Sequence, residues 1–314
     1  MADHIPEPVH TPEGPTYEGR RLARPTEEVV DQGAGFDVKT LVSRRSVLGL
    51  IGLGVGASVL AACGGATTTS ATSTAASTSA ATGEIPDETA GPYPGDGSNG
   101  PDVLEEAGIV RSDIRSSIGA DAPVDGVPLS FTFTVTDLAN DDVPFENVAV
   151  YAWHCDAQGR YSMYSEGVEN ESWLRGVQVA DADGRVTFKS IVPACYSGRW
   201  PHIHFEVYPD VDSITDSANA ISTSQMALPE DVLGDIYALS AYEGSVENLA
   251  QVSLANDNVF GDDDGALQMA TISGDTDSGY VASLAVRVDT STAASAGAPP
   301  SAGGGPAGGG PAGS

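Results

Sequence analysis

The alternation of apolar and polar residues between positions 128 and 138 constrains the fold of this chain most. Leu129, Phe131, Phe133 and Val135 alternate there with serine and threonine. Successive side chains of a β-strand point to opposite faces, so a period of two predicts a strand with one buried face. The run therefore favours a sheet that packs one face against a second layer.

Four further segments have the same β-strand character, and turns rich in Asp, Gly or Asn separate them. They are residues 148–154, 185–191, 202–208 and 280–288. One helix is expected over about residues 229–239, because Pro229 suits a first helical turn. Short strands separated by turns predict an all-β fold, a β-sandwich with one short helix and long loops.

The first 62 residues are interpreted as an export signal and not as part of this fold. Arg44 and Arg45 form a twin-arginine pattern, and an apolar run over residues 47–62 follows them. The run ends in Leu-Ala-Ala-Cys, which resembles a bacterial lipoprotein cleavage box and predicts lipidation of Cys63. A short transmembrane anchor is the alternative, although the run is slightly short of the roughly 20 residues that a span needs.

The rest of the chain divides by composition. Residues 63–83 are mainly Ser, Thr, Ala and Gly and are expected to form a flexible tether, and residues 290–314 a disordered Ala/Gly/Pro tail. The folded domain is expected over residues 84–289. These boundaries predict a lipid-anchored protein on the outer face of the cytoplasmic membrane. The twin-arginine route carries proteins that are already folded.

The charge of the chain excludes one class of partner. Asp and Glu number 44 against 14 Lys and Arg, and the formal net charge is −30. Such a surface repels nucleic acid phosphates, and no stretch supplies the basic patch that nucleic acid binding needs. The negative charge favours solubility and is also typical of proteins from high-salt habitats.

Two cysteines remain if Cys63 carries lipid. Cys155 and Cys195 then form an even pair in an oxidising compartment, which favours a disulfide. A pair of thiol metal ligands is the alternative, although no nearby CxxC spacing supports a zinc site.

A histidine pair lies within one of the expected strands. His202 and His204 are two residues apart, so both imidazoles should point to the same face of the strand. Two imidazoles on one face can bind a metal ion. A purely structural pair of histidines is the alternative when the pattern is considered alone.

The residues around this pair strengthen the metal hypothesis. Residues 193–201 lead directly into the pair, residues 153–162 and 173–184 precede them, and a Thr-Ala-Gly-Pro-Tyr segment begins at Thr89. The order of these blocks resembles the intradiol ring-cleavage dioxygenase family, which includes the catechol and protocatechuate dioxygenases. The resemblance covers about residues 89–262 and is closest to the shorter, exported branch of that family.

The resemblance implies specific roles for individual residues. The four ligands of an iron(III) ion would be Tyr161, Tyr196, His202 and His204, with Tyr196 as the ligand that leaves when substrate binds. Arg199 and Gln225 would be catalytic, and Thr89, Gly91, Pro92 and Tyr93 would line the substrate pocket. Tyr164 competes with Tyr161 for the first ligand position, but within a strand it would point to the other face.

The implied reaction is cleavage of a catechol-type ring with O₂ to a muconate-type diacid. Phenolate oxygens suit iron(III), because a tyrosine with an ordinary pKa of about 10 gives up its proton at neutral pH only beside a strong Lewis acid. A zinc or copper ion at the histidine pair is a further possibility. The alternative function is an exported, metal-containing β-sandwich binding module without turnover.

Overall fold

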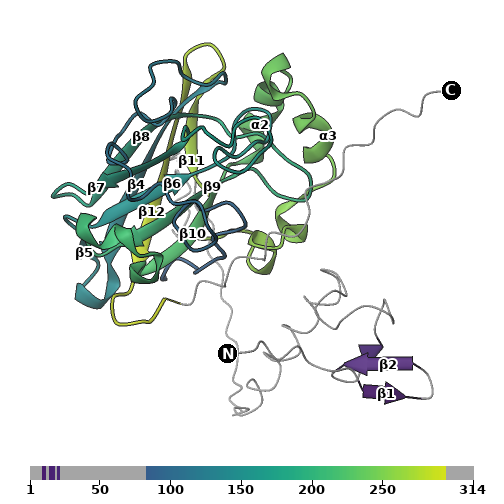
Figure 1. Ribbon diagram of the computed structural model, residues 1–314, viewed down its shortest axis with the longest axis horizontal. Helices are drawn as coiled ribbons and strands as arrows, with labels where there is room; N and C mark the ends of the chain where they lie inside the picture. The colour runs from purple at the N-terminus through teal and green to yellow at the C-terminus, as the bar shows by residue number, and fades with distance from the viewer. Residues whose placement is uncertain (1–8, 12–13, 18–19, 22–82, 295–314) are drawn as a thin grey trace, which may run out of the picture. The chain divides into compact units, whose positions relative to one another are not determined.

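The computed structural model describes residues 9–11, 14–17, 20–21 and 83–294 (Figure 1). The predicted twin-arginine pattern, the apolar run, Cys63 and almost all of the tether and tail lie outside these residues. Among the described residues, no helix is long and apolar enough to cross a membrane.

The chain forms two separate units, and the first contains a small sheet near the N-terminus. Three short strands build it: β1 (Val9–Thr11), β2 (Gly14–Tyr17) and β3 (Arg20–Arg21). Neighbouring strands pair antiparallel in the order β1-β2-β3. No strand was predicted here, within the predicted export signal.

The second unit contains two larger sheets. The first has the order β10-β9-β6-β7, with antiparallel neighbours. Its strands are β6 (Ala149–Trp153), β7 (Arg175–Val179), β9 (His202–Tyr208) and β10 (Ser222–Ala227). The other sheet is built from β4 (Pro128–Asp137), β5 (Val143–Pro144), β8 (Arg185–Ile191), β11 (Thr271–Asp275) and β12 (Gly279–Val288). Within it β12 runs parallel to β4, and β8 pairs antiparallel with β4.

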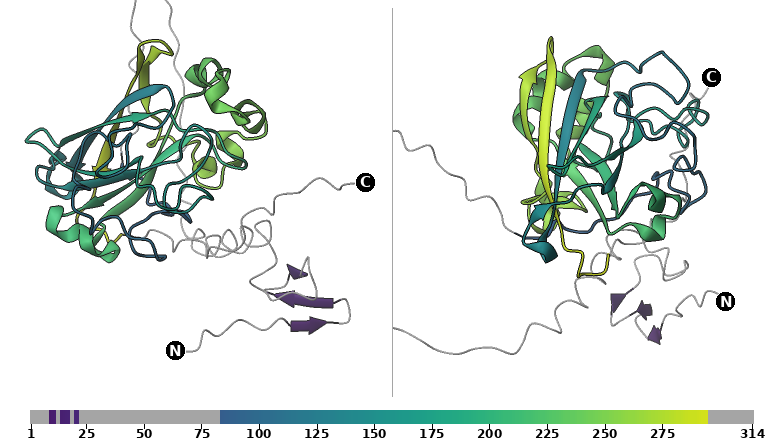
Figure 2. Two further views of the ribbon diagram at one scale, coloured as in Figure 1. Left: turned by 45° about the horizontal axis from the view of Figure 1, so that its top comes forward. Right: turned by 90° about the vertical axis from the view of Figure 1, so that its left-hand side faces the viewer.

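The hydrophobic core lies between these two sheets. On β4 the alternating side chains Leu129, Phe131, Phe133 and Val135 are all buried, as the period of two predicts. The ring of Phe133 meets that of Phe205 on β9 at a centroid distance of 4.6 Å. In the right-hand view of Figure 2, yellow β12 and blue β4 lie in one layer, and the teal and green strands lie beside them. The predicted all-β sandwich is therefore confirmed.

The two described α-helices are short and lie near each other at one edge of the sandwich (Figure 1). The predicted helix is α2 (Glu230–Tyr237), directly after Pro229, and α3 (Ser245–Leu249) is a second helix that was not predicted. Six 3₁₀ turns complete the described helical segments: Leu138–Asn140, Val211–Thr215, Ser217–Asn219, Ser240–Tyr242, Leu254–Asn256 and Phe260–Asp262.

The outer face of the β10-β9-β6-β7 sheet is covered by the segment that begins at residue 83. Backbone hydrogen bonds fix this segment along its length: the amide of Glu88 donates to the carbonyl oxygen of Thr223, and that of Arg111 to the carbonyl oxygen of Val177. Side chains on this outer face are consequently buried although they lie outside the sandwich core. The candidate site lies in this second, covered layer.

Candidate metal centre

The two histidines of β9 point to the covered face of the sheet, as their spacing predicts. Both are 2% exposed, and Nε2 of His202 lies 3.0 Å from Nε2 of His204. The two ring planes are nearly perpendicular, at 79°. Residues between and beyond them, Ile203 and Phe205, point into the sandwich core.

Neighbouring groups fix both imidazoles. Nδ1 of His202 donates to the carbonyl oxygen of Trp200 over 2.5 Å, which leaves the lone pair of Nε2 directed away from the backbone. The ring of His204 stacks on that of Trp153, with centroids 4.9 Å apart and planes 7° from parallel. Nδ1 of His204 is buried without a hydrogen-bond partner.

Two tyrosines from separate loops complete a cluster with these histidines. Tyr161 follows β6 and Tyr196 follows β8, yet their hydroxyl oxygens lie 3.4 Å apart. The hydroxyl of Tyr196 is also 3.3 Å from Nε2 of His202. Oxygen and nitrogen atoms of Tyr161, Tyr196, His202 and His204 thus converge, and we call these four residues the ligand cluster.

Tyr164 lies outside the ligand cluster. Its hydroxyl accepts a hydrogen bond from the amide of Gly95 over 2.8 Å and donates to the side chain of Asn99 over 2.7 Å. The choice of Tyr161 over Tyr164 agrees with this geometry, but the expected reason does not. Residues 162–164 form a turn and Tyr161 lies outside any strand, so the two tyrosines do not lie on one strand with opposite faces.

Burial favours the neutral forms of all four cluster residues. It raises the pKa of Tyr196 to about 12 and that of Tyr161 well above its usual value. Burial, followed by neighbouring positive charge, lowers the pKa values of His202 and His204 well below their usual range. Two imidazole lone pairs and two phenol oxygens fit a small, highly charged cation that displaces the phenol protons. Within the described residues, no group of three or more His, Cys, Asp or Glu side chains offers another metal site.

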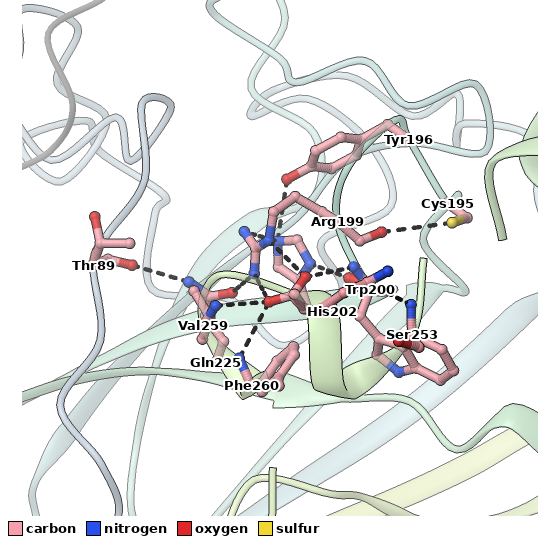
Figure 3. A network of polar contacts seen from close by, with 12 residues as sticks. Thr89, Cys195, Tyr196, Arg199, Trp200, His202, Gln225, Ser253, Val259 and Phe260 are labelled. Atoms are coloured by element: carbon pink, nitrogen blue, oxygen red, sulfur yellow. Dashed lines mark hydrogen bonds and ion pairs between the residues drawn. The ribbon is translucent and has the colours of Figure 1, made fainter. Parts of the chain in front are cut away.

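Arg199 lies at the edge of the ligand cluster and is held by two residues (Figure 3). Its Nε donates to Asp257 over 2.9 Å, its Nη2 donates to the side-chain oxygen of Gln225 over 2.6 Å, and its Nη1 is 3.4 Å from Nε2 of His202. Arg199 therefore forms an ion pair with Asp257 and at the same time lies beside His202. Sequence reasoning missed Asp257, which has no motif around it and whose side chain is fully buried.

Gln225 connects Arg199 to the predicted substrate segment. It lies opposite His204 in the pairing of β10 with β9, and its side-chain nitrogen donates to the carbonyl oxygen of Thr89 over 3.0 Å (Figure 3). The hydroxyl of Thr89 in turn accepts a hydrogen bond from the amide of Gly91 over 3.0 Å. The structure therefore brings Gln225 and Thr89 together beside the ligand cluster.

The remaining residues of the substrate segment also lie beside the cluster. Gly91 has φ +74°, and a Cβ atom there would lie 3.2 Å from Cε1 of His204, so glycine permits the close approach. Next to it, Pro92 accepts a hydrogen bond at its carbonyl oxygen from Asn99 over 2.7 Å. The ring of Tyr93 packs against that of Tyr161 at a centroid distance of 5.0 Å.

A second arginine, Arg175 on β7, donates hydrogen bonds to segments that flank the ligand cluster. It is 1% exposed and donates to carbonyl or hydroxyl oxygens without a described carboxylate partner. Its acceptors include the carbonyl oxygens of Tyr93, at 2.9 Å, and of Ser162, at 3.0 Å. Because Ser162 follows Tyr161 in sequence, Arg175 joins the substrate segment to the loop that carries a cluster tyrosine. Arg175 lies in the block of residues 173–184 that carries part of the family resemblance, but no role was predicted for it.

The predicted disulfide between Cys155 and Cys195 is not present in the structure. Both cysteines are free and buried. The thiol of Cys155 is directed to the carbonyl oxygen of Ala194, at 3.7 Å, and the thiol of Cys195 to that of Arg199, at 3.6 Å. Each sulfur therefore has its own carbonyl partner, and neither is a member of the ligand cluster. The alternative of two thiol metal ligands is not supported either.

Part of the sequence is similar to a family model and to one curated protein. A family model described as Dioxygenase matches residues 98–202, which include Tyr161, Tyr196, Arg199 and His202. Catechol 1,2-dioxygenase 1 from Acinetobacter lwoffii is 26% identical over 159 residues. That alignment covers 45% of this chain and 49% of the relative, so the chain spans about half the length of the curated protein it matches.

Solved structures agree with the fold. An intradiol ring-cleavage dioxygenase from Tetranychus urticae aligns with a TM-score of 0.51 and 24% identity, over 68% of this chain and 98% of that one. A second dioxygenase structure aligns with a TM-score of 0.53 and 23% identity, over 68% of this chain and 97% of that one. The chain is thus similar in fold to intradiol ring-cleavage dioxygenases, and part of its sequence matches the dioxygenase family model and the curated relative.

Proposed function

We propose that the protein is a non-haem iron(III) intradiol dioxygenase that cleaves a catechol-type ring with O₂. The observation that carries this proposal is the convergence of Tyr161, Tyr196, His202 and His204, with Arg199 held beside them. A binding module without turnover has no need for an arginine fixed by both a buried carboxylate and a glutamine. The product would be a muconate-type diacid that carries both atoms of O₂.

The four cluster residues would hold the iron. Phenolate oxygens are hard, anionic ligands, and two of them offset much of the charge of a trivalent ion. When bound, iron(III) would supply Lewis acidity that draws electron density from a chelated catechol and so activates the ring towards O₂.

The two tyrosines would have different roles because their surroundings differ. Tyr161 is 2% exposed and has Tyr93 packed against its ring, so it is fixed in place. Tyr196 is only partly buried and lies on a loop that precedes β9. We therefore assign Tyr196 as the residue that moves when catechol binds, with its phenolate oxygen accepting a proton from a substrate hydroxyl.

Arg199 would stabilise the negative charge that builds up on the substrate during ring opening. Its guanidinium is always charged, and Asp257 and Gln225 hold it in one orientation before substrate arrives. A preorganised cation needs no reorientation during the reaction, which is the basis of electrostatic catalysis. The link from Gln225 to Thr89 also ties this orientation to the substrate segment.

Export and lipid anchoring form the second part of the proposal, and they are supported by sequence alone. A location outside the cytoplasmic membrane is supported by the twin-arginine pattern at Arg44 and Arg45 and by the cleavage box that ends in Cys63. Fractionation of cells that express the protein or its Cys63→Ser variant tests this. The variant should lose lipid modification and membrane retention. Retention equal to that of the wild type would refute the lipid anchor.

Turnover is tested with purified protein reconstituted with iron. Iron(III) bound by tyrosinate absorbs visible light, so the loaded protein should be coloured, and the colour should change when catechol is added. Oxygen uptake should then match formation of a diacid product in equal amounts. Colour without oxygen uptake over a panel of catechols would instead favour a binding module.

A further inference from the structure

The predicted substrate segment continues into a loop of residues 92–100, and no helix or strand includes this loop. Its second residue, Tyr93, packs its ring against two tyrosines that follow β6. The centroid distances are 5.0 Å to Tyr161 and 5.2 Å to Tyr164. Tyr161 belongs to the ligand cluster and Tyr164 does not. The ring of Tyr93 therefore connects the 92–100 loop to the ligand cluster and to the tyrosine beside it.

The hydroxyl group of Tyr164 closes the 92–100 loop. It accepts a hydrogen bond from the amide of Gly95 over 2.8 Å and donates to Oδ1 of Asn99 over 2.7 Å. Nδ2 of Asn99 in turn donates to the carbonyl oxygen of Pro92 over 2.7 Å. The directions are fixed, because a backbone amide only donates and a carbonyl oxygen only accepts. This chain of hydrogen bonds joins the middle of the loop to its first residue through Tyr164.

The ring of Tyr164 has a separate partner in Arg175. The guanidinium carbon of Arg175 lies 5.5 Å from the centroid of this ring, within the range of a cation–π contact. Arg175 also donates to the carbonyl oxygens of Tyr93, over 2.9 Å, and of Pro94, over 2.6 Å. A phenylalanine in place of Tyr164 would keep the ring contacts and lose only the hydrogen bonds of the hydroxyl.

We propose that Tyr164 and Asn99 are positioning residues for catechol binding, because they close the 92–100 loop that holds Tyr93 against Tyr161. The inference rests on the proposed function, since it concerns the same site. It combines the ring packing that joins Tyr93 to the ligand cluster with the chain of hydrogen bonds that joins the loop to Tyr164. The tyrosine that is not a member of the ligand cluster thus acts on substrate affinity.

Two single variants of the iron-loaded full-length protein test this role. Tyr164→Phe removes the hydroxyl, and Asn99→Ala removes the link to Pro92. Each should raise KM for catechol by about three- to tenfold, the effect of losing one or two hydrogen bonds, whereas kcat should change little. The visible absorption band before catechol is added should stay the same, because all four residues of the ligand cluster remain.

Tyr242→Phe is the matched control. The hydroxyl of Tyr242 is bonded in the same way: it accepts from the amide of Val127 over 2.9 Å and donates to the carbonyl oxygen of Val192 over 2.9 Å. Both partners lie outside the 92–100 loop. Tyr242→Phe should therefore lower the melting temperature, as Tyr164→Phe does, without raising KM for catechol.

The double variant Tyr164→Phe/Asn99→Ala tests whether the two residues act through one chain of hydrogen bonds. A chain that is already broken loses little more when it is broken again. The rise in KM of the double variant should therefore be close to the larger of the two single rises and well below their product. A rise equal to the product would overturn the shared chain.

The remaining outcomes separate this inference from the dioxygenase proposal. A weakened visible band in Tyr164→Phe would overturn the positioning role, because Tyr164 would then act as a ligand. An unchanged KM in both single variants, or an equal rise in KM in Tyr242→Phe, would also overturn it. The dioxygenase proposal would stand in all of these cases. Absence of oxygen uptake by the wild type would refute the dioxygenase proposal, while calorimetric affinities for catechol would still decide the positioning role.

Discussion

The two faces of strand β9 differ completely in chemistry although both are buried. Ile203, Phe205 and Val207 point into the sandwich core and are fully buried. On the other face, His202, His204, Glu206 and Tyr208 are 2% exposed or less. One strand therefore belongs to two interiors, one of them apolar and the other polar.

The difference shows where stability and function come from in this domain. Burial of an apolar side chain such as Phe205 stabilises the fold by roughly 1.5–3 kcal/mol, whereas a buried polar group costs free energy unless it is paired. Glu206 illustrates the polar case, because burial and then Asp96 raise its pKa to about 8, and it accepts a hydrogen bond from Tyr208 over 2.8 Å. The polar face is therefore expected to contribute less to folding, and the convergence of its histidines with Tyr161 and Tyr196 fits the proposed metal centre.

The largest expected difference is between substitutions of two neighbouring residues, His204 on the polar face and Phe205 on the apolar face. His204→Ala should abolish iron binding and activity while the domain stays folded, because the histidine contributes little to the sandwich core. Phe205→Ala should retain iron at low temperature but lower the free energy of unfolding by about 3–5 kcal/mol. Metal analysis and urea denaturation of both variants measure the two effects.

The comparison fails if the two effects do not separate. Full iron content in His204→Ala would remove that residue from the ligand cluster. A loss of stability in His204→Ala as large as that in Phe205→Ala would show that the covered face is a second folding core. His202→Ala provides a replicate on the same face.

Arg199 should give the next largest effect, on rate alone. Arg199→Ala removes one preorganised electrostatic contact and should lower kcat by on the order of 10²–10³, with iron and the catechol-induced colour change retained. Arg115→Ala is the control, since it breaks an exposed Arg–Asp pair outside the ligand cluster. Wild-type turnover in Arg199→Ala would exclude the arginine from the reaction.

Sequence alone predicted the apolar face of the sandwich, and the residues that meet in the ligand cluster, better than the elements that support them. Strands with clear alternation, such as β4 and β12, were confirmed nearly to the residue. β10 was missed because its Ser-Thr-Ser-Gln sequence shows no alternation, yet the strand is fully buried. Its polar side chains are satisfied locally, as when Ser224 donates to the carbonyl oxygen of Pro86 over 2.7 Å.

The supporting residues of the site were missed for a related reason. Asp257 and Arg175 act through partners that are distant in sequence, and no local pattern records such partners. Charged residues are almost never fully buried, so an isolated Asp or Arg in a sequence is expected at the surface. The predicted disulfide between Cys155 and Cys195 was wrong for another reason. It rested on an even number of cysteines in an oxidising compartment and not on the distance between the two side chains.

Substitution of Arg175 should lower kcat less than substitution of Arg199 does. It should shift the loop of Tyr161 and the substrate segment more. Arg175→Lys retains the charge but cannot supply the same fork of donors to Tyr93, Pro94 and Ser162. Each buried carbonyl left without a donor costs about 1–3 kcal/mol, so the melting temperature should fall. Because the loop of Tyr161 shifts, the visible absorption band of the iron-loaded protein should also move. KM for catechol should rise by a larger factor than kcat falls. If Arg175→Lys leaves both the visible absorption band and KM for catechol unchanged, Arg175 only stabilises the fold and does not position the site.

The smallest expected effect is a pH dependence of stability that Glu88 contributes. Its folded pKa of about 7 lies above the ordinary value, so its carboxyl holds a proton more tightly in the folded state. This contribution is fully present below the ordinary pKa of about 4.3 and is lost as the pH rises through the folded pKa. Glu88→Gln should therefore match the wild type near pH 4 and become more stable from pH 5 to 8. Solvent screening of the half-buried carboxyl limits the gain to about 1 kcal/mol. Urea denaturation at four pH values measures this difference in stability, with Glu146→Gln as the control because Glu146 is exposed. A difference that stays constant with pH would show that the pKa of Glu88 is not raised in the folded state.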